Sequence, residues 1–283
     1  MKKFVLVIII LFSHVLLADE IRVVTTTTVI YDLVKNNGGN KVEVDYLSRG
    51  DQDVHFLEIL PSYMMKLRKA DLFFKIGFEL ELWSYQLVDG SRNSDLVIID
   101  LSAAITPKEV PTTKVDASQG DIHPFGNPHY WLDPDNSKIM ANEIYDALSA
   151  QSPEDEQYFK SNLDDYIAEL EKKIVEWENK MLELEQKQVV FFHAAWIYFA
   201  DRFNVKIAGY VEPKPGIPPS PKHVEQLVNT MKNNNVKVII AANYFDESKV
   251  KNISQKVGAT PFIVPLYVKG NEKIDDICCC DHT

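Results

Sequence analysis

Short runs of β-branched and aromatic residues recur along the chain, and each run is followed by a segment whose apolar residues have helical spacing. Runs of this kind are typical of buried strands, and the spacing of the intervening segments predicts helices. The runs begin at residues 21, 41, 73, 96, 189, 205, 236 and 260. Strands that alternate with helices form parallel sheets. Because the pattern restarts after residue 187, we expect two α/β lobes, each built on a parallel sheet.

The two halves are separated by a long helical pattern at residues 153–187. Ser152 and Asp155 form an S-x-x-D capping signal, and Pro153 suits the first helical position. No glycine or further proline interrupts the segment, so a single helix of about 34 residues would be about 50 Å long. That length exceeds one small lobe. We therefore expect one long rigid helix that joins the lobes, with a coiled-coil partner helix as the weaker alternative.

The first eighteen residues, MKKFVLVIIILFSHVLLA, have the pattern of a secretory signal peptide. Lys2 and Lys3 precede an apolar run that is too short to span a bilayer, and no cysteine for lipid attachment lies at the expected cleavage point. No later stretch is apolar enough to cross a membrane, so we expect a periplasmic protein that is not membrane-embedded. The expected division is a signal peptide at 1–18, an N-terminal lobe at 19–152, a linking helix at 153–187 and a C-terminal lobe at 188–283.

The charge balance is acidic. The full chain carries a formal net charge of −11, and loss of Lys2 and Lys3 leaves 28 basic against 41 acidic residues, a net charge of −13. This balance argues against nucleic acid or anionic lipid as a partner. It suits the capture of a cation, although an acidic soluble surface is the commoner explanation. We expect a monomer.

The three cysteines, Cys278, Cys279 and Cys280, are adjacent and lie close to the end of the sequence. Adjacent cysteines rarely pair with one another, so no disulfide framework is expected. With His282 the tail CCCDHT could bind a soft metal, but a frayed or truncated terminus is the simpler interpretation.

Three histidines lie where a predicted strand passes into a predicted helix. His55 and His129 belong to the first lobe, and His193 ends a strand of the second. Ligands of open α/β sheets bind at the carboxyl ends of the strands, so the three side chains could converge in a cleft between the lobes. A single loop histidine is more often a packed or solvated residue, but three together favour a zinc site.

Three segments carry a resemblance to a known family. DVHFLEILPS, GNPHYWLDP and FFHAAWIYFADRFNVKIAGY resemble, in this order, motifs of the periplasmic metal-binding proteins that feed ABC importers of zinc and manganese. The resemblance covers almost all of the chain after the signal peptide. It implies that His55, His129 and His193 bind the ion and that a membrane permease receives it. A histidine at the third position favours Zn²⁺ over Mn²⁺, because oxygen-rich sites suit manganese.

The chain departs from the family where a fourth ligand, an aspartate, is expected after the last strand. The segment there reads FIVPLYVKGNEKIDD, with Val268 and Lys269 at the acidic position. Either the site has three protein ligands plus water, or another residue replaces the aspartate. His123 is the first candidate, with a solvated loop histidine as its alternative, and Asp121 and Glu212 are further candidates. Glu58 is expected to position a ligand rather than to be one.

Other functions use the same residues. Three histidines and an open position also describe a catalytic zinc site, in which Glu58 or Asp121 would be the general base of a hydrolase. The chain has no H-E-x-x-H or G-x-S-x-G element. A manganese-binding member of the same family is the second alternative, and an adhesin or metallochaperone is the third. We favour a zinc-binding protein of an ABC importer, not an enzyme.

Overall fold

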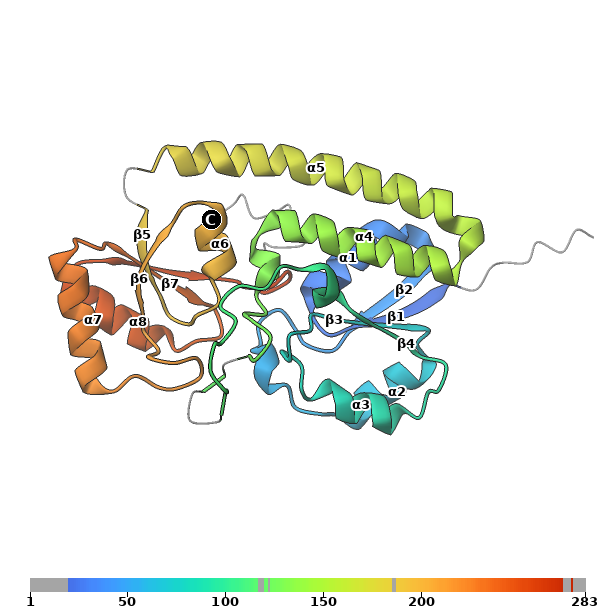
Figure 1. Ribbon diagram of the computed structural model, residues 1–283, viewed down its shortest axis with the longest axis horizontal. Coiled ribbons are helices and arrows are strands. Elements are labelled where there is room, and N and C mark those ends of the chain that lie inside the picture. The colour runs from blue at the N-terminus through green and yellow to red at the C-terminus, as the bar shows by residue number, and fades with distance from the viewer. Residues whose placement is uncertain (1–19, 117–119, 122, 185–186, 272–275, 277–283) are drawn as a thin grey trace, which may run out of the picture.

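The computed structural model describes residues 20–116, 120–121, 123–184, 187–271 and 276. Two four-stranded parallel sheets lie side by side (Figure 1). The first contains β1 (Ile21–Thr25), β2 (Val42–Tyr46), β3 (Leu72–Lys75) and β4 (Val97–Asp100), in the order β2-β1-β3-β4. The second contains β5 (Gln188–Phe191), β6 (Lys206–Tyr210), β7 (Val238–Ala242) and β8 (Thr260–Val264), in the order β6-β5-β7-β8. The predicted fold class, two parallel α/β lobes, is confirmed.

Helices connect the strands and cover the sheets (Figure 1). The first lobe carries α1 (Thr28–Gly38), α2 (Pro61–Lys69), α3 (Ser84–Ser91) and α4 (Pro134–Gln151), and the second carries α6 (Ile197–Arg202), α7 (Pro221–Asn233) and α8 (Glu247–Val257). Side-chain oxygens begin several of them: Asp133 accepts from the backbone of α4, and Ser220 does so for α7. Proline occupies the first turn of both helices, where no amide hydrogen is needed.

Helix α5 (Glu156–Leu182) crosses above both lobes (Figure 1). Its buried residues recur at helical spacing and face the first lobe, where α5 packs on α1 and α4: Phe159, Leu163, Tyr166, Leu170 and Ile174. The 27 residues make the helix about 40 Å long. The predicted helix that joins the lobes is therefore present, although it is shorter than the sequence pattern suggested.

The predicted capping box at the start of this helix is wrong. The Ser152 hydroxyl donates to the Asp155 carboxylate at 3.0 Å, and neither side chain caps a backbone amide of α5. Pro153–Asp155 forms a separate 3₁₀ turn instead. The Asp155 carboxylate also forms an ion pair with the Lys41 ammonium of the first lobe, at 2.7 Å. These two partners occupy the carboxylate, and the α-helix begins at Glu156.

The lobes share part of their core. In β5 successive residues point to opposite faces: Val190 joins a cluster within the second lobe, whereas Phe191 joins the large cluster of the first. The segment after β8 also enters that large cluster. Thr28 donates a buried hydrogen bond to the Val268 carbonyl at 2.6 Å, and Trp131 donates to the Leu266 carbonyl at 3.2 Å. The two lobes are thus packed and hydrogen-bonded to each other.

Several sequence-based expectations concern residues beyond this description. The signal peptide at 1–18 and the tail with Cys278, Cys279, Cys280 and His282 lie outside the described residues. Within the part of the chain that is described, no helix is long and apolar enough to cross a membrane.

Candidate metal centre

Three short connections deliver the histidines to the junction of the lobes. His55 lies in a 3₁₀ turn (Val54–Phe56) between β2 and α2, where the Asp53 carboxylate caps the turn by accepting from the His55 amide. His129 directly precedes a second 3₁₀ turn (Tyr130–Leu132) that leads into α4. His193 lies two residues after the end of β5. Each ring therefore projects from the carboxyl end of a sheet, as the sequence predicted.

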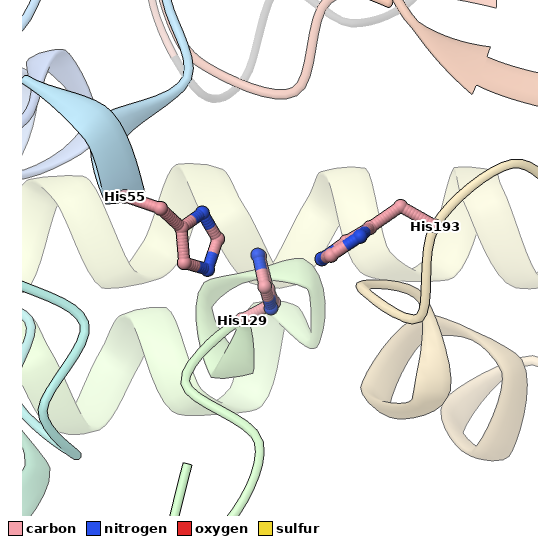
Figure 2. Close-up of side chains that lie close together, drawn as sticks. All are labelled: His55, His129 and His193. Carbon is pink, nitrogen blue, oxygen red and sulfur yellow. The ribbon is translucent and has the colours of Figure 1, made fainter. Parts of the chain in front are cut away.

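The three rings point toward one another (Figure 2). Their centroids are separated by 5.4 Å for His55 and His129, 5.7 Å for His55 and His193, and 5.6 Å for His129 and His193. One ring nitrogen from each lies within 4.8 Å of the corresponding nitrogens of the other two. Among the described residues this is the only group of three or more histidine, cysteine or acidic side chains arranged closely enough to hold an ion.

A different oxygen binds the Nδ1 atom of each ring. Asp53 Oδ1 lies 2.7 Å from Nδ1 of His55, Asn127 Oδ1 lies 3.0 Å from that of His129, and Glu212 Oε2 lies 2.8 Å from that of His193. A carboxylate or amide oxygen can only accept, so each Nδ1 carries the ring proton. In the neutral tautomer that this contact selects, Nε2 keeps its lone pair, which is the arrangement that metal-binding histidines use.

The Nε2 atom without a partner is most evident at His129. Its side chain is buried, with a relative exposure of 1%, and its Nε2 has no hydrogen-bond partner. Burial, together with the neighbouring rings of His55, His193 and His123, holds the pKa of His129 well below its ordinary value of 6.5. The ring is therefore neutral. A buried nitrogen without a partner is costly unless another group uses it.

The carboxylate beside His55 is ionised. Burial opposes ionisation of Asp53, but the hydrogen bond and the charge interaction with His55 outweigh it, so that the pKa of Asp53 is lowered. The Asp53 side chain is 27% exposed and the His55 side chain 5% exposed. An ionised acceptor increases the electron density of the imidazole, which strengthens the bond that Nε2 can make to a cation.

The other candidates occupy different positions. His123 adjoins the site, with its Nε2 3.3 Å from Nε2 of His55, but it is not within 4.8 Å of all three rings. Burial and the nearby His55 and His193 lower the pKa of His123 to about 3, so this ring is neutral as well. Glu212 holds His193 through Nδ1, as described above. Glu58 is exposed, so Asp53 rather than Glu58 positions His55.

The last strand provides no acid to the centre. Val268 is 4% exposed and packed in the shared core. The Lys269 ammonium lies 4.0 Å from the centroid of the Tyr31 ring, a cation–π contact with the first lobe. A cavity of about 210 Å³ adjoins the imidazoles, and two acidic residues, Glu109 and Asp121, are among those that line it.

The orienting residues Asp53, Asn127 and Glu212 were only partly visible in the sequence. Asp53 and Asn127 each lie two residues before the histidine that they hold, and both belong to the motifs that carry the resemblance. Glu212 was a further candidate for the fourth ligand. Its contact with His193 spans nineteen residues and depends on the pairing of β5 with β6, so no local pattern showed that it holds the ring.

Two parallel α/β lobes that meet at a cluster of pre-oriented imidazoles define a two-lobed binding protein for a metal cation. Comparison with known proteins agrees. The family described as "Zinc-uptake complex component A periplasmic" matches residues 23–276. The chain therefore belongs to this family of metal-binding proteins of ABC importers.

Individual relatives are distant and differ in the metal that they are named for. The manganese ABC transporter substrate-binding lipoprotein PsaA of Streptococcus mitis is 25% identical over 89% of this chain and 80% of its own. The iron-binding protein YfeA of Yersinia pestis is 24% identical over 86% of this chain and 76% of its own. The crystal structure of ZnuA superposes with a TM-score of 0.79 at 25% identity, covering 89% of this chain and 93% of that one.

Proposed function

We propose that this protein captures zinc through Nε2 of His55, His129 and His193 and delivers it to the permease of an ABC importer. The observation that carries the proposal is the common orientation of the three rings. Every Nδ1 is bound to an oxygen, and one ring nitrogen of each histidine lies within 4.8 Å of those of the other two. Because Nδ1 is taken, Nε2 is the nitrogen left for the ion. Zinc binds histidine nitrogens at about 2.0–2.1 Å in tetrahedral sites, so a small inward movement of the rings suffices.

Zinc rather than manganese is favoured by the ligand atoms. The described group consists of three imidazoles and contains no carboxylate. Nitrogen ligands suit zinc, whereas manganese prefers oxygen. The relatives named for manganese leave that metal as the alternative for this chain.

The surrounding arrangement supports binding and delivery rather than catalysis. A hydrolase needs a base beside the open coordination position to activate water. The two carboxylates that contact the imidazoles, those of Asp53 and Glu212, are bound to Nδ1 and therefore hold the rings. We further propose export through residues 1–18 to the periplasm, and a division into lobes at 19–152 and 188–283 with the link at 153–187. The protein would act as a monomer.

Alanine substitution of each histidine tests this function. The affinity for zinc would be measured by competition with a chelator, and folding would be checked by circular dichroism of the metal-free protein. We expect His55→Ala, His129→Ala and His193→Ala each to weaken zinc binding by about 100-fold or more, since each removes a bond to the ion. His223→Ala is the matched control, because this histidine instead binds the Tyr210 carbonyl at 3.0 Å. A folded triad variant that binds zinc like the parent would remove that residue from the site.

A further inference from the structure

A fourth imidazole adjoins the three that face one another. His123 Nε2 lies 3.3 Å from His55 Nε2, and the two ring centroids are 5.3 Å apart. Two nitrogens that share a tetrahedral zinc ion at about 2.0–2.1 Å are themselves about 3.3–3.4 Å apart. The observed separation matches this tetrahedral edge and is longer than an ordinary hydrogen bond to nitrogen. The pair thus has the spacing of two ligands of one ion.

The backbone beside His123 has an unusual conformation. The ring lies within hydrogen-bonding reach of backbone groups of Phe78 and Glu79. Both residues have positive φ, 50° and 62°, although neither is glycine. Consecutive non-glycine residues in the left-handed region persist only where the surrounding structure holds them, and such positions cluster at functional sites.

A buried carboxylate holds this turn in place. Glu81, which is 3% exposed, accepts hydrogen bonds from the amides of Ile76 at 2.7 Å and Gly77 at 3.1 Å. It also accepts from the Thr26 hydroxyl at 2.7 Å. The turn that faces His123 is therefore fixed to β1 and β3 rather than free to relax.

We propose that His123 Nε2 becomes the fourth ligand when the ion binds, so that four imidazole nitrogens hold it. The ring must then move toward His129 and His193, because in the structure it does not lie within 4.8 Å of all three rings. This inference rests on the proposed function. To bind a metal, Nε2 must carry the lone pair and Nδ1 the proton. Backbone groups of Phe78 and Glu79 lie close enough to the ring to accept a hydrogen bond from it. His55 already has the same arrangement with Asp53.

The two residues at the acidic position of the segment after β8, Val268 and Lys269, are engaged elsewhere. The Val268 carbonyl accepts from Thr28 in the shared core, and the Lys269 ammonium lies over Tyr31. The fourth coordination position of the ion is therefore open to His123. Four nitrogen ligands would make the site selective for zinc and similar borderline ions over the harder manganese.

Cobalt serves as the probe for the coordination number, because tetrahedral Co²⁺ absorbs visible light more strongly than five- or six-coordinate Co²⁺. The parent protein loaded with Co²⁺ should show the intense spectrum. In His123→Ala and His123→Gln the position opens to solvent and more than one water can bind, so the coordination number should rise and the absorption should fall. The zinc affinity should decrease about tenfold, or 1.4 kcal/mol, because water still fills the place of the imidazole. His223→Ala should leave both unchanged.

The outcomes separate this inference from the proposed function. An unchanged cobalt spectrum and unchanged zinc affinity in both folded His123 variants would overturn His123 as the fourth ligand. The proposed function would still stand if the protein bound one zinc ion and lost that binding in His129→Ala. A parent protein that binds neither ion would overturn both.

A second variant tests the selectivity. His123→Asp replaces a nitrogen by an oxygen ligand at the same place, so the ratio of the manganese to the zinc dissociation constant should fall relative to the parent. Competition titrations with each metal give that ratio. An unchanged ratio in His123→Asp would contradict direct ligation by His123.

Discussion

Each imidazole of the site is held by a single oxygen on Nδ1, and this contact fixes both the tautomer and the direction of the ring. Two of these oxygens belong to carboxylates, Asp53 and Glu212, and one belongs to the amide of Asn127. The amide shows that charge is not required for orientation. An ionised partner should nevertheless increase the basicity of the ring and hence the strength of the metal bond.

This difference predicts an ordered series at position 212. Glu212→Gln keeps an oxygen that can accept from Nδ1 of His193, whereas Glu212→Ala leaves the ring without a partner. Zinc affinity should fall about tenfold in Glu212→Gln and toward 100-fold in Glu212→Ala. Chelator competition measures both, with the thermal stability of the metal-free proteins as the control for folding. Equal affinity in the alanine variant and the parent would show that Glu212 does not position the ligand.

Burial of neutral His129 predicts a pH dependence of stability in the metal-free protein. Its pKa is held well below 6.5, so the unfolded chain binds this proton more readily than the folded one. The contribution of His129 is complete above pH 6.5 and is lost as the pH falls below that value. From pH 7.5 to 5.5 the loss should be about 1.4 kcal/mol.

Chemical denaturation at the two pH values, in the presence of a chelator, measures this loss. Glutamine at position 129 does not titrate between pH 7.5 and 5.5. The stability of His129→Gln should therefore decrease by correspondingly less than that of the parent. If the parent and His129→Gln lose the same stability between pH 7.5 and 5.5, the buried ring is not the source of the dependence.

The three histidines could be predicted because each follows a recognisable strand, and the carboxyl ends of parallel strands form the usual site. The role of Asp53 could not be separated from that of Glu58 in the same way. Both flank His55 in sequence, and only the 3₁₀ turn at Val54–Phe56 determines which carboxylate reaches the ring. Glu212 depended on the register of β5 and β6, which contains an irregularity between Val189 and Val190.

At the scale of elements, α5 is stabilised by one buried stripe. Phe159 is fully buried against the first lobe, whereas Leu182 at the far end of the helix is 75% exposed. Phe159→Ala should lower the free energy of unfolding by about 3–5 kcal/mol, because it removes a large side chain and leaves a cavity. Leu182→Ala should change it by less than about 0.5 kcal/mol. Urea denaturation measures the free energy of unfolding of both variants. Equal stability of Phe159→Ala and Leu182→Ala would contradict this account of α5.

The periodicity of the chain predicted α5 correctly as an element but not its ends. Apolar spacing continues through Leu184, yet the α-helix ends at Leu182. At the other end the ion pair between Lys41 and Asp155 depends on the position of another lobe segment, which no local pattern contains. Element boundaries of this kind are determined by tertiary contacts.

At the scale of the whole molecule, the shared core restricts how far the lobes can separate. Leu266 and Val268 of the second lobe are each 4% exposed and hydrogen-bond to the first lobe. Zinc binding should therefore change the radius of gyration by less than about 1 Å, as in pre-organised complexes. Small-angle X-ray scattering of the metal-free and zinc-loaded protein measures this. A contraction of several ångströms would indicate a hinge closure that the shared core does not allow.

The central claim is that the ion binds to Nε2 of three imidazoles from both lobes. Anomalous diffraction at the zinc edge, from crystals of the zinc-loaded protein, tests it most directly. We expect one strong peak at about 2.0–2.1 Å from Nε2 of His55, His129 and His193, with each Nδ1 still bound to its oxygen. A peak bound through Nδ1, or one that lies away from these three rings, would contradict the account.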